Sequence, residues 1–138
     1  MDDAQTDSYF NDASINRTSF SFLNLINQDR WETSWTPVFG SITLVGTPTY
    51  TGRYRRVGKQ CQFQVRIVPG TTIATNAGTD YMNLPMTAQG ISGFGYMVDA
   101  TSHIVVGQGH MDTTNSRFWL PSQGASSDTF ELYGEFEV

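Results

Sequence analysis

A strict alternation of apolar and polar residues in the middle of the chain is the feature that most constrains the fold. In residues 60–68 the apolar positions are Cys61, Phe63, Val65 and Ile67, and the residues between them are Gln60, Gln62, Gln64 and Arg66. A period of two places successive side chains on opposite faces of a β-strand, so this pattern predicts a strand with one buried face. Residues 129–138 repeat the pattern, with Phe130, Leu132, Phe136 and Val138 on the side expected to face inward.

Further short apolar runs, each bounded by glycine, proline or a polar turn, predict more strands of the same kind. They cover residues 42–45, 50–57, 81–85, 93–98, 103–106 and 117–120, while 71–79 fits a weak strand or a loop and 122–128 a loop. Charged residues make up only 15% of the chain, and the residue types that favour helices are scarce. We therefore expect an all-β fold, a jelly-roll-like antiparallel β-sandwich over residues 31–138.

The first 30 residues differ from the rest. They are rich in Asp, Asn and Ser up to Asn16, and a single apolar cluster follows, formed by Phe20, Phe22, Leu23, Leu25 and Ile26. The spacing of this cluster fits either a strand or one turn of helix. Because one cluster is too small to form a core of its own, we expect residues 1–30 to be an anchoring arm that docks on another surface.

Composition limits the partners. The net charge is −5, which argues against a general nucleic-acid binder, because neutralising phosphates requires clustered Lys and Arg. No apolar run approaches the length needed to span a bilayer, so we expect no membrane insertion. The acidic, polar start resembles neither a secretory signal nor a transit peptide, so we expect the protein to be assembled in the cytoplasm in which it is synthesised.

The charges are unevenly distributed. Residues 31–66 hold five of the eight basic residues, namely Arg53, Arg55, Arg56, Lys59 and Arg66. Residues 67–138 hold seven acids and one base, and three of these acids, Glu131, Glu135 and Glu137, share one face of the last strand. We expect the two clusters to face each other, within one subunit or between subunits, because each alone would repel itself.

No arrangement of residues predicts an active site. Cys61 lies in register with buried apolar residues, so it is expected to be a small core residue and not a nucleophile. His103, His110 and Asp112 have no third imidazole to complete a metal site, and the three strand glutamates fit a solvated face better than a catalytic pair. The prediction is a protein without enzymatic activity, metal or other cofactor.

One longer motif does stand out. It reads Trp-x-Pro, then about a dozen residues, then Tyr-x-Gly-x-Tyr-x-Arg-Val-Gly, followed by an apolar residue and Phe at alternate positions. Its members here are Trp35, Pro37, Tyr50, Gly52, Tyr54, Arg56, Val57, Gly58, Cys61 and Phe63. This pattern resembles a β-sandwich domain found in virion proteins of tailed bacteriophages, at the tips of tail fibres and tailspikes and in capsid decoration proteins.

The resemblance implies a homotrimer of jelly-roll-like domains and supplies no catalytic residues. We expect the trimer contacts to involve Trp35, Pro37, Tyr50, Arg53, Tyr54, Arg55 and Gly58, since tyrosine and arginine bury area while keeping a polar tip. A domain that follows an arm of only 30 residues, with no shaft repeat, fits a capsid decoration (cement or head-fibre-like) protein on the virion surface, bound to the major capsid protein.

A tail-tip knob, attached to a tail protein and binding host-surface polysaccharide, is the alternative. Its candidate glycan contacts are Trp31, Tyr96 and Trp119.

Overall fold

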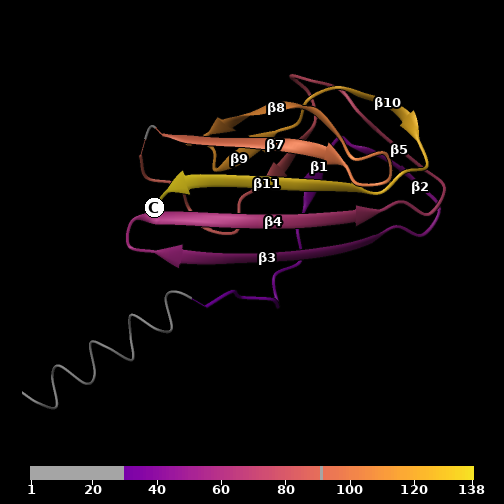
Figure 1. Ribbon diagram of the computed structural model, residues 1–138. Helices are drawn as coiled ribbons and strands as arrows, with labels where there is room; N and C mark the ends of the chain where they lie inside the picture. Colours follow the sequence, from indigo (N-terminus) through magenta and orange to yellow (C-terminus); the bar gives the residue numbers. More distant parts are fainter. Residues whose placement is uncertain (1–29, 91) are drawn as a thin grey trace, which may run out of the picture. The chain divides into compact units, whose positions relative to one another are not determined.

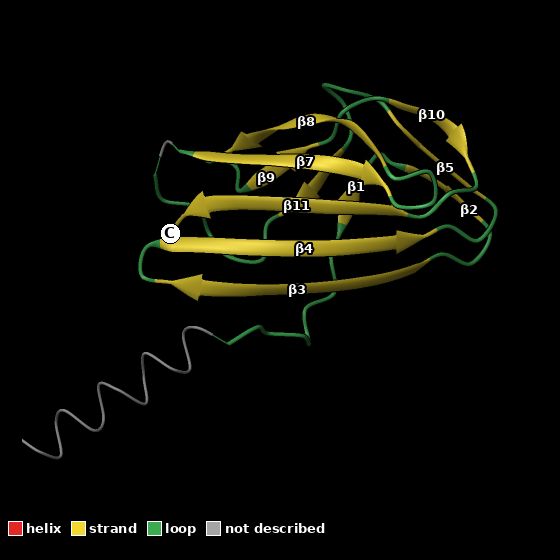
Figure 2. Ribbon diagram, viewed as in Figure 1, coloured by secondary structure: helices red, strands yellow, loops and turns green. Residues whose placement is uncertain are grey.

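The computed structural model describes residues 30–90 and 92–138, which form eleven β-strands and no helix (Figures 1 and 2). The candidate anchoring residues Phe20, Phe22, Leu23, Leu25 and Ile26 lie outside the described residues, as does the rest of the expected arm before Arg30. The strands are β1 (Phe39–Gly40), β2 (Thr43–Val45), β3 (Thr49–Val57), β4 (Gln60–Val68), β5 (Thr72–Thr75), β6 (Tyr81–Asn83), β7 (Gly93–Asp99), β8 (Ile104–Asp112), β9 (Arg117–Trp119), β10 (Gln123–Ser126) and β11 (Phe130–Glu137). The expectation of an all-β fold is confirmed.

The strands form two antiparallel sheets. The larger sheet has eight strands in the order β1-β6-β9-β8-β7-β11-β4-β3, and the smaller has three in the order β10-β5-β2. In Figure 1 the long strands β7, β11, β4 and β3 run side by side, while β9 and β1 lie behind them, so the larger sheet is curled. One face of this sheet therefore lies on the inside of the curl and the other on the outside.

The two strands with the clearest alternation occur where the sequence predicts them. Strand β4 pairs with β11 in a register that places Cys61 opposite Phe136, Val65 opposite Leu132 and Ile67 opposite Phe130. All six side chains are buried, and the residues between them are half-buried or exposed. The predicted inward and outward faces of both strands are confirmed.

Other sequence-based expectations were wrong in detail. The strand expected at residues 103–106 is longer than predicted, because β8 runs from Ile104 to Asp112, and His103 lies in the turn before it. The turn requires a left-handed backbone conformation at His103, whose φ is 63°. The spacing of apolar residues gives no indication of such a turn. Residues 123–126, expected in a loop, pair with β5 as strand β10.

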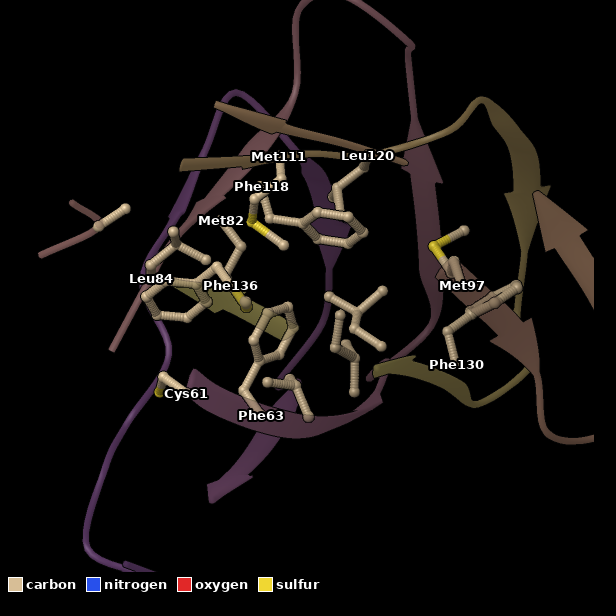
Figure 3. Packing of buried hydrophobic residues seen from close by; sticks show 14 of the residues in the cluster. Cys61, Phe63, Met82, Leu84, Met97, Met111, Phe118, Leu120, Phe130 and Phe136 are labelled. Carbon is tan, nitrogen blue, oxygen red and sulfur yellow. The ribbon is translucent and has the colours of Figure 1, made fainter. Parts of the chain in front are cut away.

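The core lies on the inner face of the curled sheet. Phenylalanine rings from β4, β9 and β11 fill its centre, and Figure 3 shows Phe63, Phe118 and Phe136 pointing toward one another. The ring centroids of Phe63 and Phe118 are 5.7 Å apart in an edge-to-face arrangement, and those of Phe63 and Phe136 are 6.3 Å apart. Ile73 of the smaller sheet and Met82 of β6 complete the same cluster, so one core supports both sheets.

Glycines make room for these rings. Gly134, Gly95 and Gly109 lie side by side on β11, β7 and β8, in a row that begins with Phe63 on β4. A Cβ atom added at Gly134 would lie 2.5 Å from Phe63 Cε2, and one added at Gly95 would lie 2.6 Å from Phe118 Cε1. The absence of side chains along this row lets two large rings lie against the sheet backbone.

The edge of the larger sheet at β3 is partly covered by the preceding segment. The Glu32 amide donates to the Tyr54 carbonyl over 2.6 Å, and the Tyr54 amide donates to the Glu32 carbonyl over 3.1 Å. A few residues later, Trp35 and Pro37 lie against Gly52 so closely that a Cβ there would be 2.7 Å from Pro37 Cγ and 2.8 Å from Trp35 Cε3. Residues 32–37 are therefore an integral part of the folded unit Trp31–Val138.

Candidate ligand-binding face

The outward-facing side chains of β3, β4, β11 and β7 form one continuous surface, here called the outer face. Because the strands pair in register, its residues lie in rows across the sheet. One row is Arg53, Gln64, Tyr133 and Tyr96, and the next is Arg55, Gln62, Glu135 and Phe94. Each row thus passes from a guanidinium through an amide to an aromatic ring.

Two of the three arginines on β3, Arg53 and Arg55, contact amide side chains and an indole ring. Nε and Nη2 of Arg53 donate to Gln64 Oε1 over 2.9 and 2.6 Å, and Nε of Arg55 donates to Gln62 Oε1 over 2.9 Å. Both guanidinium groups lie near the ring of Trp31, with their Cζ atoms 4.6 and 4.9 Å from its centroid. These cation–π contacts hold Trp31 on the outer face beside the amides.

A hydrogen-bonded chain orients the tyrosines. Arg66 Nη1 forms an ion pair with Glu131 Oε2 over 2.8 Å, and the Tyr133 hydroxyl donates to Glu131 Oε1 over 2.7 Å. The hydrogen bond to the Glu131 carboxylate, helped by partial burial, raises the pKa of Tyr133 to about 12. Tyr133 stacks on Tyr96 with centroids 5.3 Å apart and an angle of 22° between the rings. The hydroxyl of Tyr133 therefore stays protonated, and its ring holds Tyr96 in place.

Between Trp31 and these tyrosines the surface is hollowed into an open groove of about 220 Å³, here called the aromatic groove. It is lined by Trp31, Gln62, Phe63, Gln64, Phe94, Tyr96, Tyr133, Gly134 and Glu135. Phe94 and Tyr96 are 53% and 38% exposed, which is unusual for large apolar rings. Exposed rings beside amide and carboxylate groups can stack on a flat ligand and hydrogen-bond to its edge, and this arrangement is typical of a binding surface.

The structure brings two of the three candidate glycan residues together. Trp31 and Tyr96 line the aromatic groove, whereas Trp119 lies on β9 beside a separate hollow of about 450 Å³. The indole Nε1 of Trp119 donates to Asp112 Oδ2 over 3.2 Å, and its ring packs edge-to-face against Tyr81 with centroids 5.0 Å apart. Hydrogen bonds, chiefly from the Asn115 side chain, lower the pKa of Asp112 to about 2.

The motif residues pack mainly within the chain. Trp35 lies edge-to-face against Tyr54 and Phe63, with centroids 5.9 and 6.5 Å away, and Tyr50 contacts Phe39 at 5.4 Å. Pro37 is buried, and Gly58 occupies the turn after β3 with a φ of 61°. Of the seven residues proposed for trimer contacts, Arg53 and Arg55 are those on the outer face. A role of any of the seven between subunits stays a prediction.

The expected pairing of the charged clusters is found at Arg66 and Glu131. The expected contact of Arg53 or Arg55 with Glu135 stays a prediction. Strand β4 lies between β3 and β11, so Gln62 and Gln64 occupy the positions next to Arg55 and Arg53. In the described residues, the hydrogen bonds of Arg53 go to an amide oxygen and not to a carboxylate.

The cysteine and the histidines lie apart from the aromatic groove. Cys61 is fully buried, as predicted, and burial raises the pKa of its thiol to about 12. Such a thiol is protonated at neutral pH and a poor nucleophile. His103 and His110 are both exposed, and residues 30–90 and 92–138 contain no cluster of three or more His, Cys, Asp or Glu side chains that could hold a metal ion.

Phe94, Tyr133, Gln62, Gln64 and Glu135 line the aromatic groove but were not among the site residues expected from sequence. Each occupies an outward position in its own strand, and this much is visible in the alternation. Their proximity depends on the order and register of β4, β11 and β7, which residues far apart in the chain determine.

No family model, curated protein or solved structure matched the chain. Among the described residues there is also no helix long and apolar enough to cross a membrane. The functional argument therefore depends on the chain's own residues.

Proposed function

We propose that the protein is a non-enzymatic structural protein of a bacteriophage virion. In this proposal it is a homotrimeric capsid decoration protein with a jelly-roll-like β-sandwich domain, held on the particle by residues 1–30. It sits on the virion surface, and its partners are two further copies of itself and the major capsid protein.

The observation that carries the proposal is the packing of the motif that resembles phage virion domains. A side chain at Gly52 would clash with Trp35 and Pro37, which occupy the space next to it. The rings of Tyr54 and Phe63 both contact Trp35. Residues that recur together in a motif because they touch are a stronger sign of shared architecture than residues that merely share a spacing. The exposed Arg and aromatic side chains of the outer face also match the composition of protein interfaces.

Two measurements test this proposal. Light scattering of the full chain should give about three times the monomer mass of 15.4 kDa. Mass spectrometry of particles from the phage that encodes the protein should give hundreds of copies per virion. A monomer at micromolar concentration, or absence from purified particles, would overturn the proposal.

The aromatic groove favours a second candidate function, a tail-tip knob that binds host-surface polysaccharide. Trp31 and Tyr96 supply ring faces, while Gln62, Gln64 and Glu135 supply groups that hydrogen-bond to hydroxyls. A few tens of copies per virion at most, together with binding to host-surface polysaccharide, would favour this function over decoration.

A further inference from the structure

A second hollow of the outer face lies beside the aromatic groove. It has a volume of about 130 Å³, and Arg53, Arg66 and Glu131 supply its charged side chains. It shares Gln64 and Tyr133 with the aromatic groove, so the two hollows adjoin each other. We call it the basic hollow, because two guanidinium groups and one carboxylate leave it with an excess of positive charge in a chain whose net charge is −5.

The charge of Arg53 is met by neutral groups. Its Nε and Nη2 atoms donate to Gln64 Oε1, and its guanidinium lies over the ring of Trp31. Among residues 30–90 and 92–138, no carboxylate forms an ion pair with Arg53, and its Nη1 atom donates to none of them. A guanidinium that is held in place and has an N–H group to spare can bind an anion without first breaking an ion pair.

Arg66 adds a second guanidinium to the same hollow. Arg53 pairs with Gln64, two positions from Arg66 on β4, so the two arginines are diagonal neighbours about 7–8 Å apart at the backbone. Arg66 Nη1 contacts Glu131 Oε2, while Glu131 Oε1 accepts from Tyr133. Both oxygens of this carboxylate are thus engaged, and the Arg66 side chain is still 56% exposed. Its other N–H groups can donate to a ligand in the hollow.

The amides of the aromatic groove also present donors. Oε1 of Gln64 accepts from Arg53 and Oε1 of Gln62 accepts from Arg55, so each of these amides has its Nε2 group left to donate. Glu135 is the carboxylate of the groove and can accept from hydroxyl groups. A ligand that matches both hollows therefore has an anionic group at the basic hollow and hydroxyl groups in the groove.

A sugar unit that carries a carboxylate has this combination. The carboxylate is planar and matches the donor fork of a guanidinium, the hydroxyls accept from amides and donate to carboxylates, and the C–H faces of the ring stack on aromatic rings. An acidic peptide fits less well, because an extended peptide adds to a sheet through backbone hydrogen bonds at its edge. The outer face offers side chains and not an edge.

We propose that the outer face binds an acidic polysaccharide of the host surface. The carboxylate of one sugar unit lies in the basic hollow, held by Arg53 and Arg66, and the ring of that unit lies in the aromatic groove beside Trp31 and Tyr133. This inference rests on the second candidate function, since it names the class of polysaccharide that the same site binds. It adds that the site selects its ligand by charge as well as by stacking.

Titration calorimetry of the full chain tests this proposal, with hexasaccharides of polygalacturonate, alginate, hyaluronate and polysialic acid. At least one of them should bind. The methyl ester of the tightest-binding oligosaccharide keeps the sugar rings and loses the charge, so it should bind at least about tenfold more weakly. Hexaglutamate, which carries carboxylates without sugar rings, should also bind at least about tenfold more weakly than the acidic oligosaccharide.

Variants locate the carboxylate. Arg53→Gln and Arg66→Gln should each weaken binding of the acidic oligosaccharide at least about tenfold and leave binding of the methyl ester unchanged. Arg56→Gln is the matched control, because it removes the same charge from an exposed residue on the other side of β3. Tyr96→Ala should weaken acid and ester alike. Thermal unfolding of each variant is measured, and Arg53→Gln provides the test if Arg66→Gln, which takes the ion-pair partner from Glu131, does not fold.

Different failures have different meanings. Equal affinity for the acid and its methyl ester, or binding of neutral cellohexaose or maltohexaose alone, would overturn the recognition of charge but leave a polysaccharide-binding knob in place. Equal affinity for hexaglutamate would overturn the assignment of a sugar. If neither the acidic nor the neutral hexasaccharides bind, this inference and the second candidate function both fail. Conversion of the protein to a monomer by Arg53→Gln would show that this face is a subunit contact, which would also overturn the inference.

Discussion

Gly134→Ala tests whether the row of glycines on the inner face is what allows the sheet to curl over its aromatic core. The added methyl group would lie 2.5 Å from Cε2 of Phe63 and still closer to its Cζ atom. Phe63 is 1% exposed, and its ring is in contact with those of Trp35, Phe118 and Phe136. The ring has no free space to move into, so the substitution overpacks the core.

The magnitude follows from two opposing effects. Overpacking a well-packed core costs about 1–3 kcal/mol. Replacing glycine by alanine reduces the entropy of the unfolded chain and returns about 0.4–1 kcal/mol. Taking the middle of each range, about 2 and about 0.7 kcal/mol, the net loss in the free energy of unfolding should be about 1.3 kcal/mol. With a urea m-value of about 2 kcal/mol/M, the midpoint of unfolding should fall by roughly 0.6 M with m unchanged.

Gly124→Ala is the matched control, because no atom lies within 4 Å of the position its Cβ would occupy. This variant should be as stable as the parent chain or slightly more stable. Phe63→Leu shortens the side chain that the new methyl meets, so a double-mutant cycle of Phe63→Leu with Gly134→Ala should show favourable coupling. Gly134→Ala at parental stability, or a cycle without coupling, would refute the account of the glycine row.

Four further predictions concern other parts of the chain. Cys61 should react slowly with thiol reagents until denaturant is added, and Cys61→Ser should lower stability by about 1–3 kcal/mol in urea unfolding, because a buried hydroxyl replaces a thiol; rapid labelling of the native protein would contradict this. Deleting residues 1–30 should leave a cooperatively folding trimer that no longer sediments with virions, whereas loss of the unfolding transition would make the arm part of the core. His103→Gly should raise stability by about 0.5–1 kcal/mol in thermal unfolding, because φ is 63° at this exposed turn position; a lower Tm would show that the side chain has a role the backbone does not reveal. The pKa of Asp112 is about 2 in the folded chain and about 4 when unfolded, so its stabilising effect is present above pH 4 and is lost as the pH falls to 2; Asp112→Asn should make acid unfolding less steep in this range, and an unchanged profile would count against it.

Strand positions were predictable from sequence where one face is buried and the other is not. The alternation in β4 and β11 is complete, so both strands and both faces followed from it. In β8 the inward positions Gly107 and Gly109 are glycines, because the core ring of Phe118 lies against Gly109 and Pro121 lies beside Gly107. A strand whose inner face is covered by side chains of neighbouring strands has no alternation of its own, and this is why the strand was predicted only as far as residue 106.

The aromatic groove was predictable only in part. Trp31 and Tyr96 were identified as exposed rings, but nothing local in the chain places β7 beside β11 or β11 beside β4. The same strand order decides that Gln64 and Gln62 lie next to Arg53 and Arg55, and local periodicity does not give it. The pairing of β11 with β7 and β4 joins residues 31 to 77 positions apart, and a single sequence read through local periodicity does not contain it.

The backbone pairing of Glu32 with Tyr54 bears on how the β3 edge of the sheet is protected from pairing with a strand of another chain. An eight-stranded sheet ends in strands whose outer amides and carbonyls are open to pairing with another chain, and β3 is nine residues long. The segment from Trp31 to Pro37 occupies part of that edge and, through Trp35, also fills the space above Gly52. A chain shortened to begin at Trp31 would keep this protection, whereas one that begins after Pro37 would expose both the edge and the core beneath it. Proteolysis within these few residues should therefore open the β3 edge to pairing with a strand of another chain.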